Sequence, residues 1–169
     1  MFDHILVPLD GSPLAEIGLP HLVLLSRISR ARISLIRVLD PNRQQNVARQ
    51  VDPFEWQLHK AEANAYLADV AARLDGAGVQ VQTILEEGRA ADMILEYAGE
   101  QGVGLILLSS HGESGLTGWN VSSVVQKIIL RARTSIMVVR AYGDTPADLY
   151  ALQYKKILLP LDESARAEV

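Results

Sequence analysis

The sequence contains no cysteine, which excludes a disulfide framework, a thiolate metal site and a cysteine nucleophile. It has no basic excess, since 16 lysine and arginine residues stand against 20 aspartate and glutamate residues, so nucleic acid is not an expected partner. No apolar run approaches the roughly 18 residues that a membrane span needs, and no basic leader precedes the apolar run at Ile5. We therefore expect a cytoplasmic protein that neither binds nucleic acid nor enters a membrane.

Short apolar runs are the strongest regular feature of the sequence. They lie at residues 5–9, 33–38, 79–85, 105–108 and 136–139. All but the third are nearly uninterrupted, which indicates strands buried on both faces, as in a parallel sheet. Helical patterns separate them, at residues 13–29, 54–74, 90–101 and 121–131. The alternation predicts an α/β protein with a three-layer, doubly wound, Rossmann-like fold, whose ligands bind beyond the carboxyl ends of the strands.

Two local patterns add detail to the helices. Ser12, Pro13 and Glu16 supply an N-cap, a first-turn proline and a nearby acid, so we expect the first helix to begin at Pro13. In the second helix, apolar residues recur at spacings of three and four, and we expect this stripe to face the sheet. Its members are Leu58, Ala61, Ala65, Ala68 and Ala72.

The beginning of the chain is repeated near its end. Residues 4–16 and 156–168 are identical at eight of thirteen positions, with Pro, Asp, Ser and Glu recurring in order. Because the offset is about one domain length, we interpret 1–142 as one domain, 143–154 as a linker and 155–169 as the start of a second copy. The alternative is a sixth strand that merely resembles the first. In the first interpretation the run from Ile157 to Leu161 lacks its own domain and should seek a sheet edge or a neighbouring chain.

A glycine- and hydroxyl-rich loop follows the fourth apolar run, at residues 109–123. Glycine lets a backbone approach an anion closely, successive amides form a concave donor nest, and a following helix adds its own unsatisfied amides. Such a loop is suited to holding phosphate. Glycine-rich loops between strands and helices are also plain structural turns, so the composition alone leaves both interpretations open.

Several short motifs recur in order along the chain. They are ILVPLDGS at 5–12, IRV at 36–38, SSHGESG at 109–115, SSV at 122–124 and SIMVV at 135–139. This order resembles the universal stress protein family over residues 1–140. The resemblance implies a five-stranded parallel sheet of order 3-2-1-4-5 and dimerisation through the last strand. It also implies, as in many members, ATP binding through Gly-x-x-Gly, nine residues, then Gly-Ser or Gly-Thr.

Carried over position by position, that pattern falls on Ser109, Gly112, Ser122 and Ser123. Serine thus replaces two of its three glycines, which weakens phosphate binding but leaves it possible if neither position needs a positive φ. The ends of the first two strands match family positions that line the nucleoside. For Asp10, a hydrogen bond to the nucleoside competes with a structural role as a cap. The implied site comprises Pro8, Leu9, Asp10, Val38, Leu108, Ser109, Gly112, Gly115, Ser122, Ser123 and Val124.

The residues of the loop favour binding over catalysis. There is no Walker-type motif, and no lysine or arginine lies between Ser109 and Lys127 to neutralise a transferring phosphoryl group. His111 is the one candidate base, and a lone histidine beside a glycine more often orders a loop. We expect an ATP-binding regulatory domain, with magnesium brought by the phosphates. The alternatives are a scaffold of the same family without nucleotide affinity, and a nucleotidyl-transferring enzyme, against which the absence of a His-x-Gly-His motif counts.

The expected protein partner is another domain of the same kind. Ser135 to Arg140 would form an edge strand in the implied order, and an uncovered strand edge invites pairing. We expect a homodimer through this strand, or a pseudo-dimer with the second domain whose start lies at 155–169.

Overall fold

The computed structural model describes residues 2–41, 52–111, 121–141, 149–150 and 152–158. Strands and helices alternate as the sequence predicts. The elements are β1 (His4–Pro8), a short 3-10 helix (Ala15–Gly18), α1 (Leu19–Ile28), β2 (Arg32–Leu39), α2 (Pro53–Gly76), β3 (Gln82–Glu87), α3 (Ala90–Glu100), β4 (Leu105–Ser109), α4 (Ser123–Arg131) and β5 (Ser135–Val139).

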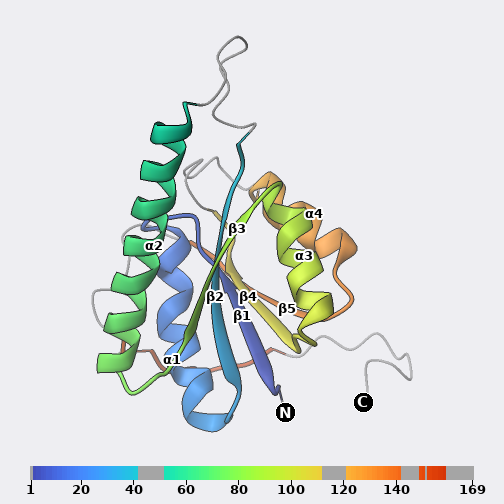
Figure 1. The fold of residues 1–169 in the computed structure, drawn as a ribbon. Coiled ribbons are helices and arrows are strands. Elements are labelled where there is room, and N and C mark those ends of the chain that lie inside the picture. Colours follow the sequence, from blue (N-terminus) through green and yellow to red (C-terminus); the bar gives the residue numbers. More distant parts are fainter. Residues whose placement is uncertain (1, 42–51, 112–120, 142–148, 151, 159–169) are drawn as a thin grey trace.

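The five strands form one parallel sheet in the order β3-β2-β1-β4-β5. Helices α1 and α2 cover one face of the sheet, and α3 and α4 cover the other (Figure 1). The predicted three-layer fold and strand order are therefore confirmed. The order reverses direction between β1 and β4, which places a topological switch point at the centre of the sheet.

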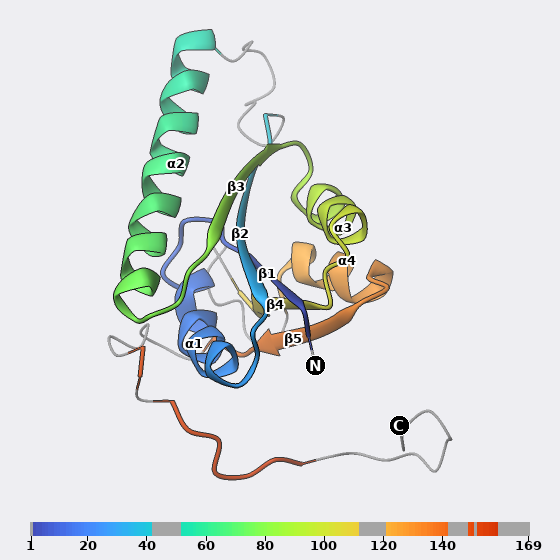
Figure 2. The ribbon, with the colours of Figure 1, turned by 60° about the horizontal axis from the view of Figure 1, so that its bottom comes forward.

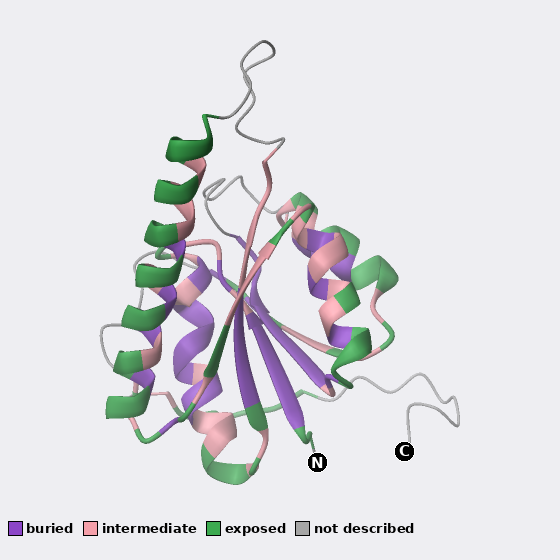
Figure 3. Cartoon of the chain, in the orientation of Figure 1, coloured by how far each residue is buried: buried purple, intermediate pink, exposed green. Residues whose placement is uncertain are grey.

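The sheet has a hydrophobic core on each side. Along β1, Ile5 and Val7 point to the side of α1 and α2, whereas Leu6 points to the side of α3 and α4. Strand β4 is buried throughout, β1 is buried except for Pro8, and β2 is buried from Ile33 to Ile36 (Figure 3). This two-sided burial explains why the apolar runs in the sequence are continuous rather than alternating.

Two predicted boundaries are wrong in detail. Regular α-helix begins at Leu19 rather than Pro13, because Pro20 lacks the N–H that would bond to the carbonyl of Glu16. The N–H of Leu19 bonds to that carbonyl instead, in the tighter 3-10 pattern. The third strand begins at Gln82, since Val79 belongs to the turn that ends α2 and donates its N–H to the carbonyl of Leu74 at 2.9 Å.

The stripe predicted to bury α2 is also wrong. Its five members, Leu58 and the alanines at 61, 65, 68 and 72, are all exposed. The face that packs on the sheet consists of Ala63, Leu67, Val70 and Leu74. Leucine and valine remove more apolar surface from water than alanine does, so the helix turns the larger side chains inward.

The described residues after β5, 149–150 and 152–158, lie on the same side of the sheet as α1 (Figure 2). The Tyr150 hydroxyl donates to the carbonyl of Gly76 at 3.2 Å, and the Tyr154 hydroxyl lies 2.6 Å from Nδ1 of His21. Ile157 and Leu158 are exposed and belong to no strand, and residues 159–161 lie outside the described residues. The docking of the 157–161 run therefore stays a prediction. Within the described ranges, none of the helices combines the length and the hydrophobicity needed to cross a bilayer.

Candidate functional site

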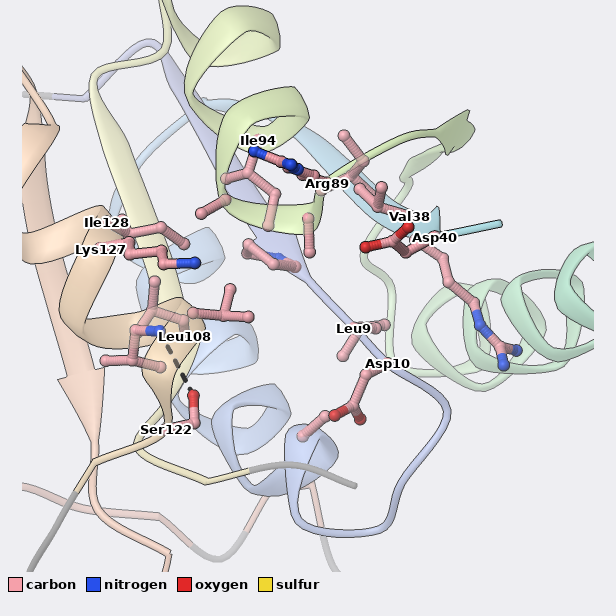
Figure 4. A pocket seen from close by; sticks show the side chains of 18 of the residues that line it. Leu9, Asp10, Val38, Asp40, Arg89, Ile94, Leu108, Ser122, Lys127 and Ile128 are labelled. Atoms are coloured by element: carbon pink, nitrogen blue, oxygen red, sulfur yellow. Dashed lines mark hydrogen bonds between the residues drawn. The ribbon is translucent and has the colours of Figure 1, made fainter. Parts of the chain in front are cut away.

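A cavity of about 1040 Å³ lies beyond the carboxyl ends of β1, β2 and β4. Its floor comes from the residues that end these strands, and its walls come from the N-terminal turns of α3 and α4 (Figure 4). This is the switch point of the sheet, where doubly wound folds bind ligands. The volume is large enough for a nucleotide-sized ligand.

Nine residues of the site predicted from the sequence line this cavity. They are Pro8, Leu9, Asp10, Val38, Leu108, Ser109, Ser122, Ser123 and Val124. The other two, Gly112 and Gly115, lie outside the described residues. The fold thus gathers residues from four separate stretches of the sequence around one space. Their binding of a ligand stays a prediction.

The turn after β1 is held by Asp10. Its Oδ1 accepts hydrogen bonds from the backbone N–H of Ser12 at 3.0 Å and from the Ser12 hydroxyl at 2.7 Å. Gly11 has a φ of +91°, and a side chain there would meet the guanidinium of Arg37 at 2.9 Å. Asp10 therefore has the structural role that the sequence left open, and it also lines the cavity.

The guanidinium of Arg37 stacks on the ring of Tyr66, with 5.2 Å between Cζ and the ring centroid. Burial raises the pKa of Tyr66, and the nearby Glu16 and Asp10 raise it further. The phenol therefore remains neutral at physiological pH. Arg37 thus connects β2 to Tyr66 of α2, with its guanidinium close to Gly11 in the turn after β1.

The start of α4 shows how serine fits the two positions where the family pattern has glycine. Ser122 is the N-cap with a φ of −59°, and Ser109 lies in the extended strand β4, so neither position needs a positive φ. The Ser122 hydroxyl accepts the N–H of Val125 at 3.3 Å, and the Ser122 N–H bonds to the carbonyl of Ser110 at 3.0 Å. Serine therefore preserves the backbone but occupies one of the amide donors that a phosphate would use.

Two polar groups at the floor of the cavity are buried without a partner among the described residues. They are the Ser109 hydroxyl and Nε2 of His111, in side chains that are 6% and 4% exposed. The Ala141 N–H donates to the Ser110 hydroxyl, which lies 2.9 Å from Nδ1 of His111. If that hydroxyl donates to Nδ1, the proton of the neutral ring is on Nε2. A buried polar group without a partner costs about 1–3 kcal/mol, so an oxygen-bearing ligand at this floor would be stabilised.

Besides Arg37 of β2, three basic side chains line the cavity and were missed in the sequence. They are Arg89 at the N-cap of α3, and Lys127 and Arg131 on α4. Arg131 forms an ion pair with Asp92, and this bond, with the charges of Arg89 and Lys127 nearby, lowers the pKa of that carboxyl. Lys127 was missed because it lies after the motif loop, in α4. It stands one helical turn after Ser123, so both side chains lie on the same face of that helix, and this spacing could have indicated it.

The charges are unevenly distributed around the cavity. Asp10 and Asp40 follow β1 and β2, the acid Glu62 of α2 also lines the cavity, and Arg37 of β2 is the basic residue on this side. Lys127 stands on the opposite side, beside Leu108 and Ser122 (Figure 4). Such a site suits a ligand with hydroxyl groups at one end and an anionic group at the other. No group of three or more acidic or histidine side chains in the described part of the chain is arranged to hold a metal ion.

Comparison with known proteins gives a consistent result. The model of the universal stress protein family matches residues 1–140. Universal stress protein MJ0577 of Methanocaldococcus jannaschii is 25% identical over 155 residues, covering 83% of this chain and 96% of that protein. The solved structure of MJ0577, 26% identical in the structural comparison, has a TM-score of 0.74 and covers 85% of this chain and 99% of its own.

Two further solved structures share the fold. A universal stress protein in complex with cAMP is 19% identical with a TM-score of 0.63, covering 83% of this chain and 98% of its own. A universal stress protein of Archaeoglobus fulgidus in complex with dAMP is 18% identical with a TM-score of 0.58, covering 80% of this chain and 95% of its own. At these identities the likeness establishes the fold alone.

Proposed function

The chain belongs to the universal stress protein family, and on that premise we propose that it binds an adenine nucleotide, ATP in particular, in the cavity at the switch point of the sheet. The nucleotide serves as a regulatory ligand rather than as a substrate, with at most slow hydrolysis. The observation that carries this proposal is the convergence of nine motif residues and four lysine or arginine side chains on one cavity.

The apolar part of the cavity suits the base. Leu9, Val38 and Ile94 line it from β1, β2 and α3, and a purine ring between them would exchange water for apolar contacts on both faces. Asp10 stands next to Leu9, where a carboxylate oxygen can accept a hydrogen bond from a ribose hydroxyl. The nucleoside end therefore lies over β1 and β2.

The phosphates then extend toward α4. Lys127 supplies a positive charge there, and the helix N-terminus adds its partial positive charge. The Ser109 hydroxyl and Nε2 of His111 are buried polar groups at the floor of the cavity. Magnesium would enter with the phosphates, whose oxygens supply its ligands. Two proteins of this fold were solved with cAMP and dAMP, which supports an adenine nucleotide as the ligand class.

The test is isothermal titration calorimetry of nucleotide-stripped protein with ATP and magnesium. We expect a Kd on the order of micromolar, and about a fivefold weaker Kd for Lys127→Gln, which removes about 1 kcal/mol of exposed charge interaction. Lys155→Gln is the matched control, since Lys155 is exposed and does not line the cavity. Absence of heat at millimolar ATP would reject the proposal. An equal loss of ATP affinity in both variants would show that the phosphates do not lie near α4.

A second candidate function is a dimerising scaffold without nucleotide. One observation favours it: Ser122 already caps the helix amide of Val125, which leaves fewer donors for phosphate. Strand β5 pairs only with β4 among the described strands, and Val138 on it is 38% exposed. We propose that this edge, Ser135 to Arg140, pairs with a second domain of the same kind in either function. An oligomeric state that saturating ATP leaves unchanged would favour the scaffold.

The repeated segment at residues 156–168 supports a tandem arrangement. We propose that residues 143–154 link this domain to a second one that begins at 155–169 and that supplies the partner edge for β5. Light scattering of a chain extended by a complete second domain tests this arrangement. A monomeric tandem with a covered β5 edge is the expected result, and a tandem that still dimerises through β5 would contradict it.

A further inference from the structure

Two unpartnered polar groups lie close together in the sequence at the floor of the cavity. The Ser109 hydroxyl and Nε2 of His111 have no hydrogen-bond partner among the described residues, and their side chains are more than nine-tenths buried. Both residues line the cavity. Folded proteins pair nearly all of their buried polar groups, so each exception needs an explanation. Two exceptions in one cavity indicate a ligand group that pairs with them.

The backbone around Ser110, between these two residues, is already engaged in hydrogen bonds. Its N–H bonds to the carbonyl of Val139 at 2.8 Å, and its carbonyl accepts the N–H of Ser122 at 3.0 Å. The second bond also places this part of the floor next to the N-cap of α4. The groups that the floor offers to a ligand near α4 are therefore the side chains of Ser109 and His111.

Both side chains can donate a hydrogen bond. The Ser110 hydroxyl accepts the N–H of Ala141 at 3.1 Å and lies 2.9 Å from Nδ1 of His111. When that hydroxyl gives its own proton to Nδ1, the neutral ring carries its proton on Nε2, and a charged ring carries one there in any case. The Ser109 hydroxyl also has a proton, which rotation about the Cβ–Oγ bond can direct. Two such donors suit an oxygen with several lone pairs, above all an anionic one.

The place of the floor favours a phosphate oxygen over a ribose hydroxyl. The ribose lies over β1 and β2 in the proposed complex, whereas Ser109 ends β4 and is followed by Ser110, which bonds to the N-cap of α4. Lys127 stands beside the end of β4, near Leu108 (Figure 4). A phosphate oxygen at this floor therefore also meets the positive charge of Lys127 and the positive end of α4.

We propose that the side chains of Ser109 and His111 bind a phosphate oxygen of the nucleotide from the floor of the cavity. This assignment rests on the proposed nucleotide function and adds to it the residues that hold the phosphate. Position 109 is glycine in the family pattern, and glycine has no side chain that could donate. Ser109 is therefore a binding residue particular to this chain, and its effect is opposite to that of Ser122, whose hydroxyl occupies a helix amide.

Ser109→Ala separates a binding role from a structural one. A buried hydroxyl without a partner lowers stability, so its removal should leave the free energy of unfolding of the ligand-free protein, measured in urea, unchanged or higher. The same change should weaken the binding of ATP with magnesium about tenfold in calorimetric titration, the usual effect of losing a hydrogen bond to a charged group. Ser26→Ala is the matched control, because that hydroxyl lies on α1, outside the cavity, and its loss should leave ATP affinity unchanged.

Two further ligands show which part of the nucleotide the floor holds. Adenosine has no phosphate, so it should bind equally to the unmodified chain and to Ser109→Ala. Tripolyphosphate has no nucleoside, and it should bind more tightly to the unmodified chain than to Ser109→Ala. An equal loss of affinity for adenosine and for ATP would assign the hydroxyl to the nucleoside and would overturn the phosphate assignment.

Ser109→Gly restores the residue of the family pattern and gives an independent test. It should bind ATP as weakly as Ser109→Ala does, because both variants lack the hydroxyl. Tighter binding by Ser109→Gly would show that the serine side chain obstructs the phosphate, and it would overturn the assignment.

The ring of His111 has a test of its own. The nitrogen-15 spectrum of the imidazole rings, with His111→Gln to identify the signal, should show a protonated Nε2 whose resonance shifts when ATP is added. A ring without a proton on Nε2 could not donate from that atom, and this result would contradict the role of His111.

The same titrations distinguish this assignment from the proposed function. ATP binding of equal strength in the unmodified chain and Ser109→Ala would keep the nucleotide function and reject the floor as its phosphate site. Binding of tripolyphosphate that depends on Ser109, without any binding of ATP, would keep the floor as an anion site and reject the nucleotide. Absence of binding by both ligands at millimolar concentration would reject both.

Discussion

Replacing Ser122 with glycine should strengthen nucleotide binding while it slightly destabilises the fold. In the structure, the Ser122 hydroxyl accepts the N–H of Val125, the third residue of α4. Glycine at the N-cap gives up that bond, and the cost of a serine-to-glycine cap is only a few tenths of a kcal/mol. The N–H of Val125 then becomes available to a phosphate oxygen at the positive end of the helix.

The size of the gain follows from the bond that forms. A hydrogen bond to a charged group contributes about 1.5–3 kcal/mol, and ordering a glycine costs about 0.5–1 kcal/mol more than ordering another residue. The net gain of about 1 kcal/mol corresponds to about a fivefold lower Kd for ATP. Ser123→Gly is the matched control, because Ser123 is exposed and caps no amide, so its affinity should not rise.

Calorimetric titration of the unmodified chain, Ser122→Gly and Ser123→Gly with ATP and magnesium measures the effect, and urea unfolding measures the stability. Weaker binding by Ser122→Gly would contradict this prediction, since it would mean that the hydroxyl itself holds the ligand. Equal gains in both variants would also refute it, because loop flexibility rather than the freed amide would then be the cause.

Three other outcomes are expected. Gly88 has a φ of +143°, and a side chain there would lie 2.6 Å from Sδ of Met93. Gly88→Ala should therefore lower the melting temperature by about 4–8 °C, whereas the control Gly99→Ala, which adds a methyl group in open space on α3, should not lower it. Equal melting temperatures of the two variants would contradict this prediction. Burial lowers the pKa of His4, so below about pH 6.5 the unfolded chain binds a proton at this residue more readily than the folded chain does, and the free energy of unfolding falls as the pH drops. His4→Gln should reduce this dependence of the unfolding free energy on pH, measured by urea unfolding between about pH 7.5 and 5. An unchanged dependence would show that His4 is not its cause. Val138→Lys on the exposed β5 edge should shift any dimer toward monomer in light scattering, and a dimer that persists would place the interface elsewhere.

The fold was predictable because its signals are redundant. Continuous apolar runs mark strands buried on both faces, and each alternates with a helical pattern, so the three-layer sheet follows from both features together. The direction in which α2 faces was not predictable in the same way. Its sequence carries two apolar faces, and periodicity identifies faces without saying which one packs on the sheet. In the structure, the face with Leu67 and Leu74 packs on the sheet and the alanine face is exposed, because the leucines bury more apolar surface than alanines would.

The candidate site was also predictable only in part. Short motifs predicted the residues that end strands or begin α4, since their positions are fixed by the order of the elements. Arg89 and Lys127 were missed because nothing in the motif loop marks them; they reach the cavity only through the direction of α3 and α4. The burial of Ser109 and His111 depends on packing between distant segments, and no local pattern encodes it.

An NMR titration of the nitrogen-15-labelled chain with ATP and magnesium shows whether a nucleotide binds at the switch point of the sheet. Nucleotide binding there should progressively shift the backbone amide resonances of Leu9, Val38, Leu108 and Ser122. The resonances of His4 and Gln101, at the opposite end of the sheet, should not shift. An unchanged spectrum at millimolar ATP, or shifts confined to residues away from the cavity, would contradict nucleotide binding at this site.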